Sequence, residues 1–573
     1  MREVKQRNIP DVSLDGVTPV LQRIFASRGI VSLQQIQHGL DQLLPYDGLL
    51  NIHAAARRLF DAIRQQQRVL ILGDYDADGA TSCAVAIRAL RLLGLEQVDY
   101  LVPSRFKYGY GLSVEIVEVA RQYEPELIIT VDNGIASIAG VKAARDAGID
   151  VVITDHHLQG QQLPEANVIV NPNQQGDSFS SKALAGVGVV FYLMLALRAL
   201  MRQENWFEQR QQTMPNLAEL LDIVALGTVA DVVPLDHNNR ILVEQGLRRI
   251  RAGKAHAGIR ALAGIARREC RFIRATDLAF AIAPRLNAAG RLEDMSLGIE
   301  CLLTDDEDSA TMLAAELDNI NQERRAISRD MEDEAEAMLQ QLHLAEGDEA
   351  LPVCYCLYQP HWHQGVSGIL AGRVKDKMHR PAIVFARGEA DELKGSARSI
   401  PGFHIRDALE AVSAMNPGLI AKFGGHAMAA GLTIAADDFE TFTQCFNTYA
   451  SNIMDADTLM QCIHTDGQLA AGELSMQTAQ AIEQAAPWGQ EFPEPLFEGE
   501  FAILEKRRIG ADQRHLKLRL GYDNVDVDAV AFNQPEDSPL EANDRVSITY
   551  RIAVNRYRGF ENLQIVVQDL LEN

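Results

Sequence analysis

The sequence predicts an α/β fold with a parallel sheet, a second α/β region and a small antiparallel C-terminal barrel. First, continuous apolar strands alternate with helical segments, as in a doubly wound sheet. Second, a charged amphipathic stretch without Gly or Pro indicates a long helix. Third, short strands of alternating polarity near the C-terminus are typical of a barrel. The sheet strands are expected at 68–74, 99–103, 127–134, 151–157 and 168–173.

We expect five regions along the chain. Residues 1–65 read as helices with short breaks, and residues 66–300 hold the parallel sheet and further helices. Residues 301–345 form the long helix, as a spacer between lobes or, alternatively, as a coiled-coil partner. Strand and helix alternation returns at 346–455, and 456–573 form the barrel.

Composition indicates a cytoplasmic globular protein. The 573 residues are 47% hydrophobic and 23% charged. We find no apolar run of the roughly 18 residues that a membrane span needs and no secretory signal. The seven cysteines lack the two spaced pairs of a zinc site, so we expect them to be reduced.

Charge is distributed unevenly. The formal net charge of −24 argues against nucleic acid as a partner when taken as an average. However, ten basic residues lie between Arg240 and Arg274, opposed within that segment only by Glu244 and Glu269. The segment is either a solvated helix face or one wall of a channel for a polyanion.

Three aspartates follow the first strand of the sheet, in the sequence GDYDADGATS. Asp74, Asp76 and Asp78 lie two residues apart, which in an extended segment places them on one side. Their charges would repel unless cations neutralise them. A calcium loop of the EF-hand type is excluded, because its twelfth position would be Val85 instead of Glu and a strand precedes it. A divalent metal site therefore fits better than a solvated turn.

Acidic and imidazole groups also follow two other strands and one further apolar run. VDNG contains Asp132, DHH contains Asp155, His156 and His157, and LLDIVALGTVADVVPL ends near Asp231. We expect them to meet at one sheet edge, where ligands bind in such folds. Carboxylates with one or two imidazoles suit Mg²⁺ or Mn²⁺, and a pair of such ions can drive phosphodiester hydrolysis.

These motifs resemble those of the DHH phosphoesterase superfamily. HQGVSGILAGR, GSARS and FGGHAMAAG, at 363–373, 395–399 and 423–431, resemble the associated DHHA1 domain. GDYDADGATS, VPSRFKYGYG, LAGVGVVFYLM and APRLNAAGR are similar to the RecJ family of bacterial single-strand-specific 5′→3′ DNA exonucleases, and the last region resembles an OB-fold. The glycines at 186 and 188 lack the third spaced glycine of a dinucleotide-binding motif.

The resemblance implies roles for individual residues. Asp74, Asp76 and Asp132 would hold one ion, and Asp78, Asp132, His156 and Asp231 the other. His157 would face the scissile phosphate, and Asp155 would orient an imidazole. The catalytic set would be Asp76, Asp78, Asp132, His156 and His157. A 5′-phosphate and DNA site would comprise Arg105, Arg285, Ser396, Arg398, Gly424, Gly425 and His426.

The barrel carries basic and aromatic residues that suit a single-strand platform; ordinary barrel surface and core is the alternative. They are Lys506, Arg507, Arg508, Arg514, Lys517, Arg519, Tyr522, Tyr550, Tyr557 and Phe560.

The sequence is compatible with three functions. The first is a monomeric single-stranded DNA exonuclease of recombination and repair that uses two Mn²⁺ or Mg²⁺ ions and has a single-stranded-DNA-binding protein and a helicase as partners. The second is a phosphoesterase for pyrophosphate, short oligonucleotides or cyclic dinucleotides, which would not need a barrel. The third is a non-catalytic DNA-binding scaffold, which could lack several ligands. The complete ligand set favours the first.

Overall fold

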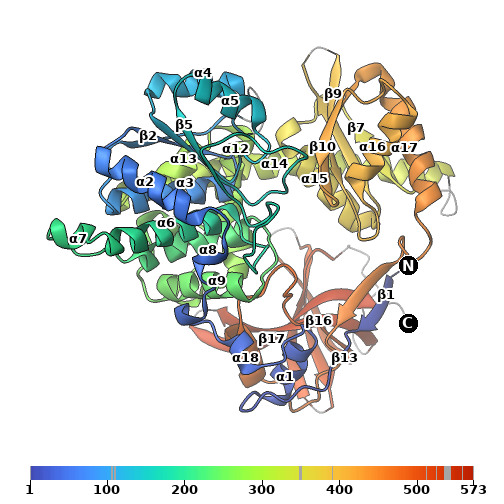
Figure 1. Cartoon of the computed structure of the whole chain (residues 1–573). Helices are drawn as coiled ribbons and strands as arrows, with labels where there is room; N and C mark the ends of the chain where they lie inside the picture. Colours follow the sequence, from blue (N-terminus) through green and yellow to red (C-terminus); the bar gives the residue numbers. More distant parts are fainter. Residues whose placement is uncertain are drawn as a thin grey trace. The chain divides into compact units, whose positions relative to one another are not determined.

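The computed structural model describes residues 2–104, 108, 111–346, 352–389, 391–510, 513–523, 525–534, 544–557 and 559–571. Its chain divides into two compact units (Figure 1). The larger unit comprises residues 5–290, 294–317 and 464–573, and the smaller unit comprises residues 1–4, 291–293 and 318–463.

A five-stranded parallel sheet forms the centre of the larger unit, as predicted. Its strand order is β3-β2-β4-β5-β6. Alternate residues of the central strands enter two different cores: Ile71 and Ile129 belong to one, and Leu72 and Ile128 to the other. Both sheet faces are therefore covered. The strands are β2 (Val69–Gly73), β3 (Val98–Leu101), β4 (Leu127–Val131), β5 (Asp150–Thr154) and β6 (Val168–Val170).

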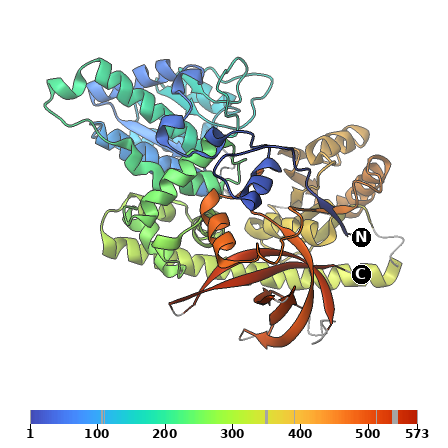
Figure 2. The ribbon, with the colours of Figure 1, turned by 90° about the horizontal axis from the view of Figure 1, so that it is seen from below.

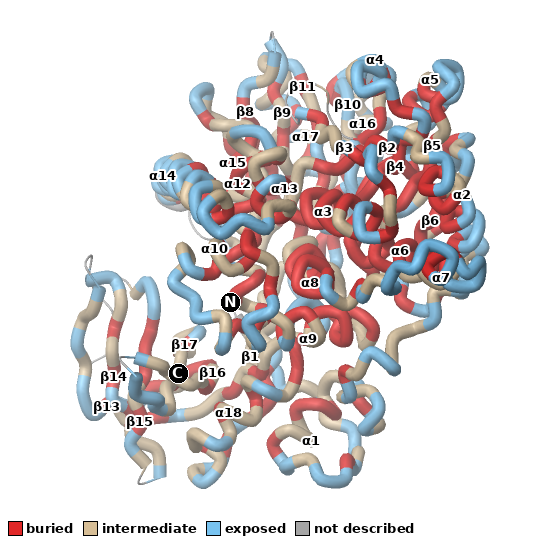
Figure 3. The backbone as a smooth tube through the Cα atoms, turned by 90° about the vertical axis from the view of Figure 1, so that its left-hand side faces the viewer, coloured by how far each residue is buried: buried red, intermediate tan, exposed pale blue. Residues whose placement is uncertain are grey.

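Helices cover both faces of this sheet, and the buried parts of β2, β4, α3, α6 and α8 are red in Figure 3. One face is covered by α2 (Ile52–Gln65), α3 (Ala77–Leu92) and α6 (Gly186–Gln203), which pack together. The other carries α4 (Val114–Ala120) and α5 (Ile138–Asp146).

One helix is apolar enough to be compared with a membrane span. Helix α6 is long and apolar enough to cross a membrane by length and composition, although Arg198 and Arg202 interrupt its apolar residues. However, 67% of this apolar window is buried inside the protein, and α6 packs against α2, α3 and α8. We therefore interpret it as a core helix.

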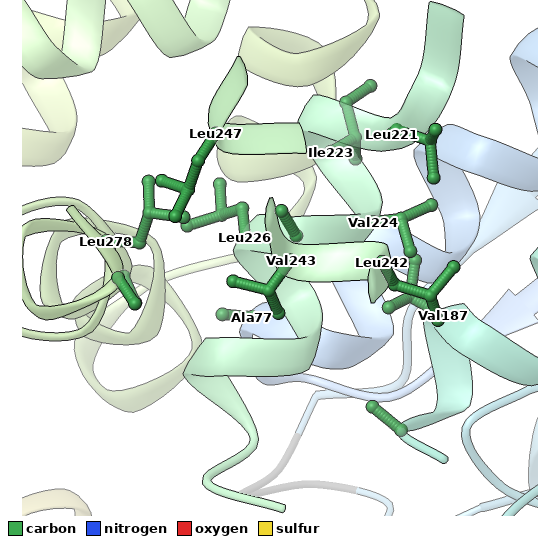
Figure 4. Packing of buried hydrophobic residues seen from close by; sticks show 14 of the residues in the cluster. Ala77, Val187, Leu221, Ile223, Val224, Leu226, Leu242, Val243, Leu247 and Leu278 are labelled. Atoms are coloured by element: carbon green, nitrogen blue, oxygen red, sulfur yellow. The ribbon is translucent and has the colours of Figure 1, made fainter. Parts of the chain in front are cut away.

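A helical region follows the sheet. Val224 and Leu226 of α8 pack close to Val243 of α9 (Figure 4). Pro284 lacks an amide to bond the carbonyl four residues earlier, which accounts for the π-helical turn that precedes α12. The helices are α7 (Trp206–Gln209), α8 (Leu221–Ala230), α9 (His237–Arg251), α10 (Ala257–Ile265), α11 (Ala275–Asp277), η7 (Leu278–Ile282), α12 (Ala283–Leu292) and α13 (Ser296–Leu303).

The N-terminus differs from the expected run of helices. Residues Arg2–Gln6 form strand β1, which pairs with β12 (Gln461–Thr465), and α1 spans Pro19–Ala26. Within the larger unit, Arg28 donates two hydrogen bonds to the buried carboxylate of Asp466. Short 3₁₀ turns lie at Leu33–Ile36, Leu40–Gln42, Tyr46–Gly48, Arg121–Tyr123, Leu217–Leu220, Cys270–Phe272 and Ala436–Asp438.

The C-terminal strands close into the predicted barrel, seen in Figure 2 in orange and red. Its order is β13-β14-β15-β17-β16, and α18 (Met476–Ala485) packs against β16. The barrel is not wholly antiparallel, because β15 and β17 pair in parallel. Its strands are β13 (Phe497–Ile509), β14 (His515–Tyr522), β15 (Val525–Ala531), β16 (Arg545–Tyr557) and β17 (Phe560–Leu571).

The smaller unit is the second α/β region. Its sheet order is β10-β11-β9-β8-β7, and only the β7–β8 pair is parallel. Met331 and Leu339 of the long helix α14 (Glu307–Glu346) pack with Leu370 of α15. The other elements are β7 (Tyr355–Tyr358), α15 (Gln364–Met378), β8 (Ala382–Arg387), β9 (Glu392–Arg398), α16 (Ile405–Met415), β10 (Lys422–Gly425), β11 (Ala429–Ala435) and α17 (Phe439–Ile453).

Candidate metal centre and phosphate pocket

The carboxylates after β2 lie in a strand-to-helix turn. Asp74 follows the strand, and Asp76 is the N-cap of α3. The Oδ1 atom of Asp76 accepts hydrogen bonds from the amides of Asp78 (2.9 Å) and Gly79 (3.0 Å). The prediction of an extended segment that carries all three aspartates is therefore wrong beyond Asp76, because helix α3 begins at Ala77. Capping satisfies amides that the helix leaves unpaired and fixes the Asp76 carboxylate.

Asp78 is buried between two helix N-termini. It lies in the first turn of α3, and its two oxygens accept hydrogen bonds from the amides of Gly186 (2.6 Å) and Val187 (2.9 Å) at the start of α6. The glycine-rich segment that does not fit a dinucleotide motif thus holds a carboxylate. A buried anion is stabilised by such amides and by the helix dipole.

Asp132 occupies a strained backbone position directly after β4. Its φ is +62°, in the left-handed region that non-glycine residues seldom adopt. Gly186 permits the close approach of α6 here, since a Cβ on that residue would lie 2.6 Å from Asp132 Cβ. Strain of this kind is characteristic of functional sites.

His156 joins the carboxylates. Its Nε2 lies 3.0 Å from Asp132 Oδ1, 3.5 Å from Asp231 Oδ2 and 4.0 Å from Asp78 Oδ2. Asp231 follows α8 as its C-cap, so the apolar run before it is a helix. Asp231 Oδ2 is buried and accepts no hydrogen bond from the residues that the structure describes.

Asp155 holds the neighbouring imidazole. Its Oδ1 lies 2.8 Å from His157 Nδ1 and also accepts from the His156 and His157 amides, while its Oδ2 accepts from Ile135 N at 2.9 Å. Hence Asp155 orients His157 instead of His156. The two imidazole centroids are 4.5 Å apart.

The larger unit brings together the six expected ligands and His157. Possible donor atoms lie within 4.8 Å of one another in three overlapping groups, two of which share Asp132 and two His156. These oxygen and imidazole donors suit Mg²⁺ or Mn²⁺. The groups are Asp74–Asp76–Asp132, Asp78–His156–Asp231 and Asp132–His156–His157.

The electrostatics of this cluster favour cations. Burial, reinforced by the Asp76 charge, raises the pKa of Asp78 to about 7. Burial and the surrounding carboxylates raise the pKa values of Asp132 and Asp231 well above their ordinary range. Burial by itself would raise the pKa of Asp155 and lower that of His157. The hydrogen bond between the two side chains outweighs burial, so the pKa of Asp155 is lowered and that of His157 is raised. A bound cation would relieve the repulsion among the carboxylates.

Three asparagines that sequence reasoning missed support the site. Asn287 Oδ1, on α12, accepts a hydrogen bond from the Ala77 amide at 2.9 Å. Asn171 and Asn173 donate to the carbonyls of His157 (2.9 Å) and His156 (2.6 Å). Two features of the sequence could have pointed to these residues: the NPN triplet that contains Asn171 and Asn173, and the asparagine of APRLNAAGR.

The expected phosphate-binding residues are divided between the units. Ser396 and Arg398 share the half-buried face of β9, whereas Arg285 is buried in the larger unit, where it donates to the Ala281 carbonyl. Arg105 lies outside the described residues.

The glycine hairpin lies in the same sheet as β9. Strand β10 contains Gly424 and Gly425, β11 separates it from β9, and the His426 amide donates to the Ala429 carbonyl at 2.8 Å. Gly425 has a φ of +143°, and a Cβ there would lie 2.5 Å from Ala430 Cα. Gly425 is therefore required for the close packing of this hairpin, whereas a Cβ on Gly424 would meet no atom within 4 Å.

The aromatic residues of the barrel fall into two groups. Tyr550 is in the core and Tyr522 packs against Phe501, whereas Tyr557 and Phe560 are 63% and 73% exposed and pair across the β16–β17 hairpin. A cavity of about 460 Å³ on the barrel is lined by Glu505, Lys506, Arg507, Lys517, Leu518, Arg519 and Asp528.

The basic segment is not a continuous wall. Arg240 is buried and its guanidinium lies 4.2 Å from the Phe492 ring centroid. Several other arginines have carboxylate partners, including Asp277 and Glu307 beyond the segment. Such partners exist for Arg248, Arg251, Arg260, Arg268, Arg271 and Arg274.

Comparison with known proteins agrees with the motifs. Family models match three regions: the DHH family N-terminal domain at 68–228, the DHHA1 domain at 350–452 and the RecJ OB domain at 465–569. The single-stranded-DNA-specific exonuclease RecJ of Escherichia coli K12 is 48% identical over 558 residues, 96% of either chain. This chain belongs to the RecJ family.

Solved RecJ structures support the fold. The structure of Thermus thermophilus RecJ with Mn²⁺ matches at a TM-score of 0.78 and 32% identity, covering 97% of this chain and 76% of that one. RecJ from the same organism with Mg²⁺ matches at 0.73 and 30% identity, covering 97% and 75%. The fold is therefore that of RecJ: a DHH parallel-sheet domain, a long helix, a DHHA1 α/β domain and an OB barrel.

Proposed function

We propose that this chain is a single-strand-specific 5′→3′ DNA exonuclease that releases mononucleotides in DNA recombination and repair. The observation that carries the proposal is the pair of donor groups, Asp74–Asp76–Asp132 and Asp78–His156–Asp231, linked by the 3.0 Å approach of His156 Nε2 to Asp132 Oδ1. Membership of the RecJ family, whose E. coli member is named for this specificity, supports the substrate.

Two divalent ions, Mn²⁺ or Mg²⁺, would be held by these residues. We assign Asp74, Asp76 and Asp132 to one ion and Asp78, Asp132, His156 and Asp231 to the other. The raised pKa values of the buried carboxylates and the unsatisfied Asp231 Oδ2 fit such cations. Bound there, the two ions would activate water and stabilise the leaving oxygen of a phosphodiester.

His157 would act on the scissile phosphate. Burial lowers the pKa of the imidazole, but the hydrogen bond between Asp155 and Nδ1 more than offsets this and raises it. In its protonated form, the ring presents Nε2–H as a donor for a phosphate oxygen. Asp155 is itself fixed by three backbone amides. It is therefore a positioning residue, and it contributes no proton to the reaction.

The terminal 5′-phosphate would be bound by Arg105, Arg285, Ser396 and Arg398, with Gly424, Gly425 and His426 along the DNA. Arginine suits this task because its planar fork pairs with two phosphate oxygens. The barrel would bind the rest of the strand: Lys506, Arg507, Lys517 and Arg519 line a cavity there, and exposed Tyr557 and Phe560 can stack on bases.

We further propose the domain limits 66–300 for catalysis and 346–455 and 456–573 for DNA binding, with 301–345 as the connector. Residues 1–65 would be an N-terminal region in which helices and short 3₁₀ turns follow strand β1. The protein would act as a cytoplasmic monomer, receiving its substrate from a helicase and a single-stranded-DNA-binding protein.

The decisive experiment digests single- and double-stranded DNA, labelled at either end, with and without Mn²⁺. We expect metal-dependent loss of the 5′ label as mononucleotide, from single strands only. Loss of the 3′ label first would refute the polarity. A preference for dinucleotides over long strands would indicate a small-substrate phosphoesterase, and DNA binding without cleavage would indicate a scaffold.

A further inference from the structure

A pair of serine hydroxyls lies behind the proposed phosphate-binding face of β9. Ser367, in the first turns of α15, is buried, and its Oγ is 2.9 Å from Ser396 Oγ on β9. The Ser367 hydroxyl also lies within donating distance, 2.9 Å, of the Gln364 carbonyl. Ser396 itself is half-buried, so it is the outer member of the pair.

The single proton on each hydroxyl makes this pair sensitive to its ligand. If Ser367 donates to the Gln364 carbonyl, Ser396 must donate to Ser367 and can present only lone pairs outward. If Ser367 instead donates to Ser396, the Ser396 proton becomes available to an acceptor. A phosphate oxygen accepts hydrogen bonds, so its binding selects the second arrangement. Linked hydroxyls polarise one another, which strengthens the outer bond.

The next residue positions the arginine. Gly368 leaves space for the Arg398 guanidinium against α15, since a Cβ at Gly368 would lie 3.0 Å from Arg398 Nη2 and 3.7 Å from Ser396 Cβ. The Arg398 guanidinium is also oriented by donation from Nη1 to the Ala397 carbonyl at 2.8 Å. Two adjacent residues of one helix thus contact both phosphate-binding candidates on β9.

We propose that Ser367 and Gly368 are positioning residues that set the preference of the enzyme for a 5′-phosphate over a 5′-hydroxyl end. Ser367 orients and polarises the Ser396 hydroxyl, and Gly368 lets Arg398 lie where its fork faces the same phosphate. This inference rests on the proposed function, because it deepens the role given to Ser396 and Arg398.

The test compares kcat/KM on two oligothymidylates that differ only in carrying a 5′-phosphate or a 5′-hydroxyl. For Ser367→Ala we expect the phosphate preference to fall about three- to tenfold, the range for one hydrogen bond. Cleavage of the 5′-hydroxyl strand should change less than about twofold on the same reasoning. Ser367→Thr keeps the hydroxyl and should restore the preference.

Two control variants, Ser451→Ala and Gly372→Ala, distinguish a positioning role from a general loss of stability. Ser451→Ala removes a hydroxyl that likewise bonds a carbonyl of its own helix, α17, and should leave the preference unchanged. Gly368→Ala should reduce the preference, whereas Gly372→Ala on the same helix, with no atom within 4 Å of the added Cβ, should not.

The outcomes distinguish the two proposals. If the unaltered protein cleaves no single-stranded DNA, the proposed function is wrong. If it cleaves single strands but does not prefer a 5′-phosphate, the assignment of the phosphate-binding residues is wrong. If it does prefer the phosphate but Ser367→Ala and Gly368→Ala keep that preference, the inference is overturned. Equal losses on both strands would also overturn it, because they would indicate a purely structural role.

Discussion

Asn287 Oδ1 accepts a hydrogen bond from the backbone amide of Ala77, with 2.9 Å between the two atoms. Ala77 lies between Asp76 and Asp78, so a side chain more than two hundred positions later fixes the turn that presents both carboxylates. Gly290, one turn further along α12, packs against the same turn, where an added Cβ would lie 1.7 Å from the Tyr75 carbonyl oxygen.

Asn287→Ala should weaken metal binding more than it weakens the fold. Loss of one hydrogen bond costs about 1 kcal/mol, so the Mn²⁺ concentration for half-maximal activity should rise roughly fivefold. A metal titration of activity measures this. Asn287→Asp retains an acceptor oxygen and should bind Mn²⁺ at least as well as the unaltered protein; unchanged metal dependence in Asn287→Ala would contradict the assignment.

Asp132→Ala should abolish cleavage, because both proposed metal positions use this carboxylate. We expect a loss of at least about a thousandfold in kcat, as for other groups that stabilise a transition state electrostatically. Binding of single-stranded DNA should survive, since the barrel is unchanged. Activity assays and fluorescence anisotropy give the two readouts, and near-normal activity would exclude the shared-ligand arrangement.

Gly186→Ala should disturb Asp132 without unfolding the protein. The added Cβ would lie 2.6 Å from Asp132 Cβ, so the strained residue at φ +62° must move. We expect a loss of activity of about tenfold or more at subsaturating Mn²⁺. Gly264→Ala in helix α10, where no atom lies within 4 Å, is the matched control and should keep full activity. Equal behaviour of the two variants would argue against close packing at Gly186.

Metal binding should weaken as the pH falls below 7. Burial raises the pKa of Asp78 to about 7 from an ordinary value of 3.8, so protons compete with the cation in this interval. Without metal, the folded protein retains a proton there that the unfolded chain has released. The contribution of Asp78 to the free energy of unfolding is therefore full below about pH 4 and declines as the pH rises to 7.

Thermal unfolding between pH 5 and 8, with Mn²⁺ or with a chelator, measures this dependence. The stabilisation by Mn²⁺ should increase with pH across the interval. Asp78→Asn is the comparison, because residue 78 then cannot titrate; it should reduce the dependence, while Asp132 and Asp231, whose pKa values are also raised, still titrate. A metal-induced stabilisation that is constant over this range would be inconsistent with competition by protons.

Tyr557→Ala with Phe560→Ala should weaken binding of single-stranded DNA by about tenfold or more, because stacking on an aromatic side chain contributes about 1–3 kcal/mol per base. Fluorescence anisotropy with long oligothymidylates measures the loss. Met312→Ala removes a 67% exposed apolar side chain from α14 and serves as the control. The idea fails if the double variant binds long strands as tightly as the control does.

Much of the fold could be predicted from sequence, because its signals are local. The strands before Asp74, Asp132 and Asp155 are continuous apolar runs between helices, and those runs predict the parallel sheet. Parallel strands end at one edge of a sheet, so the meeting of these groups followed from the pattern. The barrel strands were equally visible from their alternation.

The helix before Asp231 shows where local signals end. An apolar run buried on all sides loses its periodicity, so strand and helix look alike in sequence. The same limit applies to α6, whose composition matches a membrane span although the helix is buried in the core.

The sequence by itself determined which residue types gather at the site and the order of the domains. Only the tertiary structure decided how they are held: Asp78 between two helix N-termini, Asp132 against Gly186, the Ala77 turn on Asn287 and Ser396 on Ser367. Hydrogen bonds and close approaches between distant segments follow no period along the chain. They exist only once packing has placed those segments side by side.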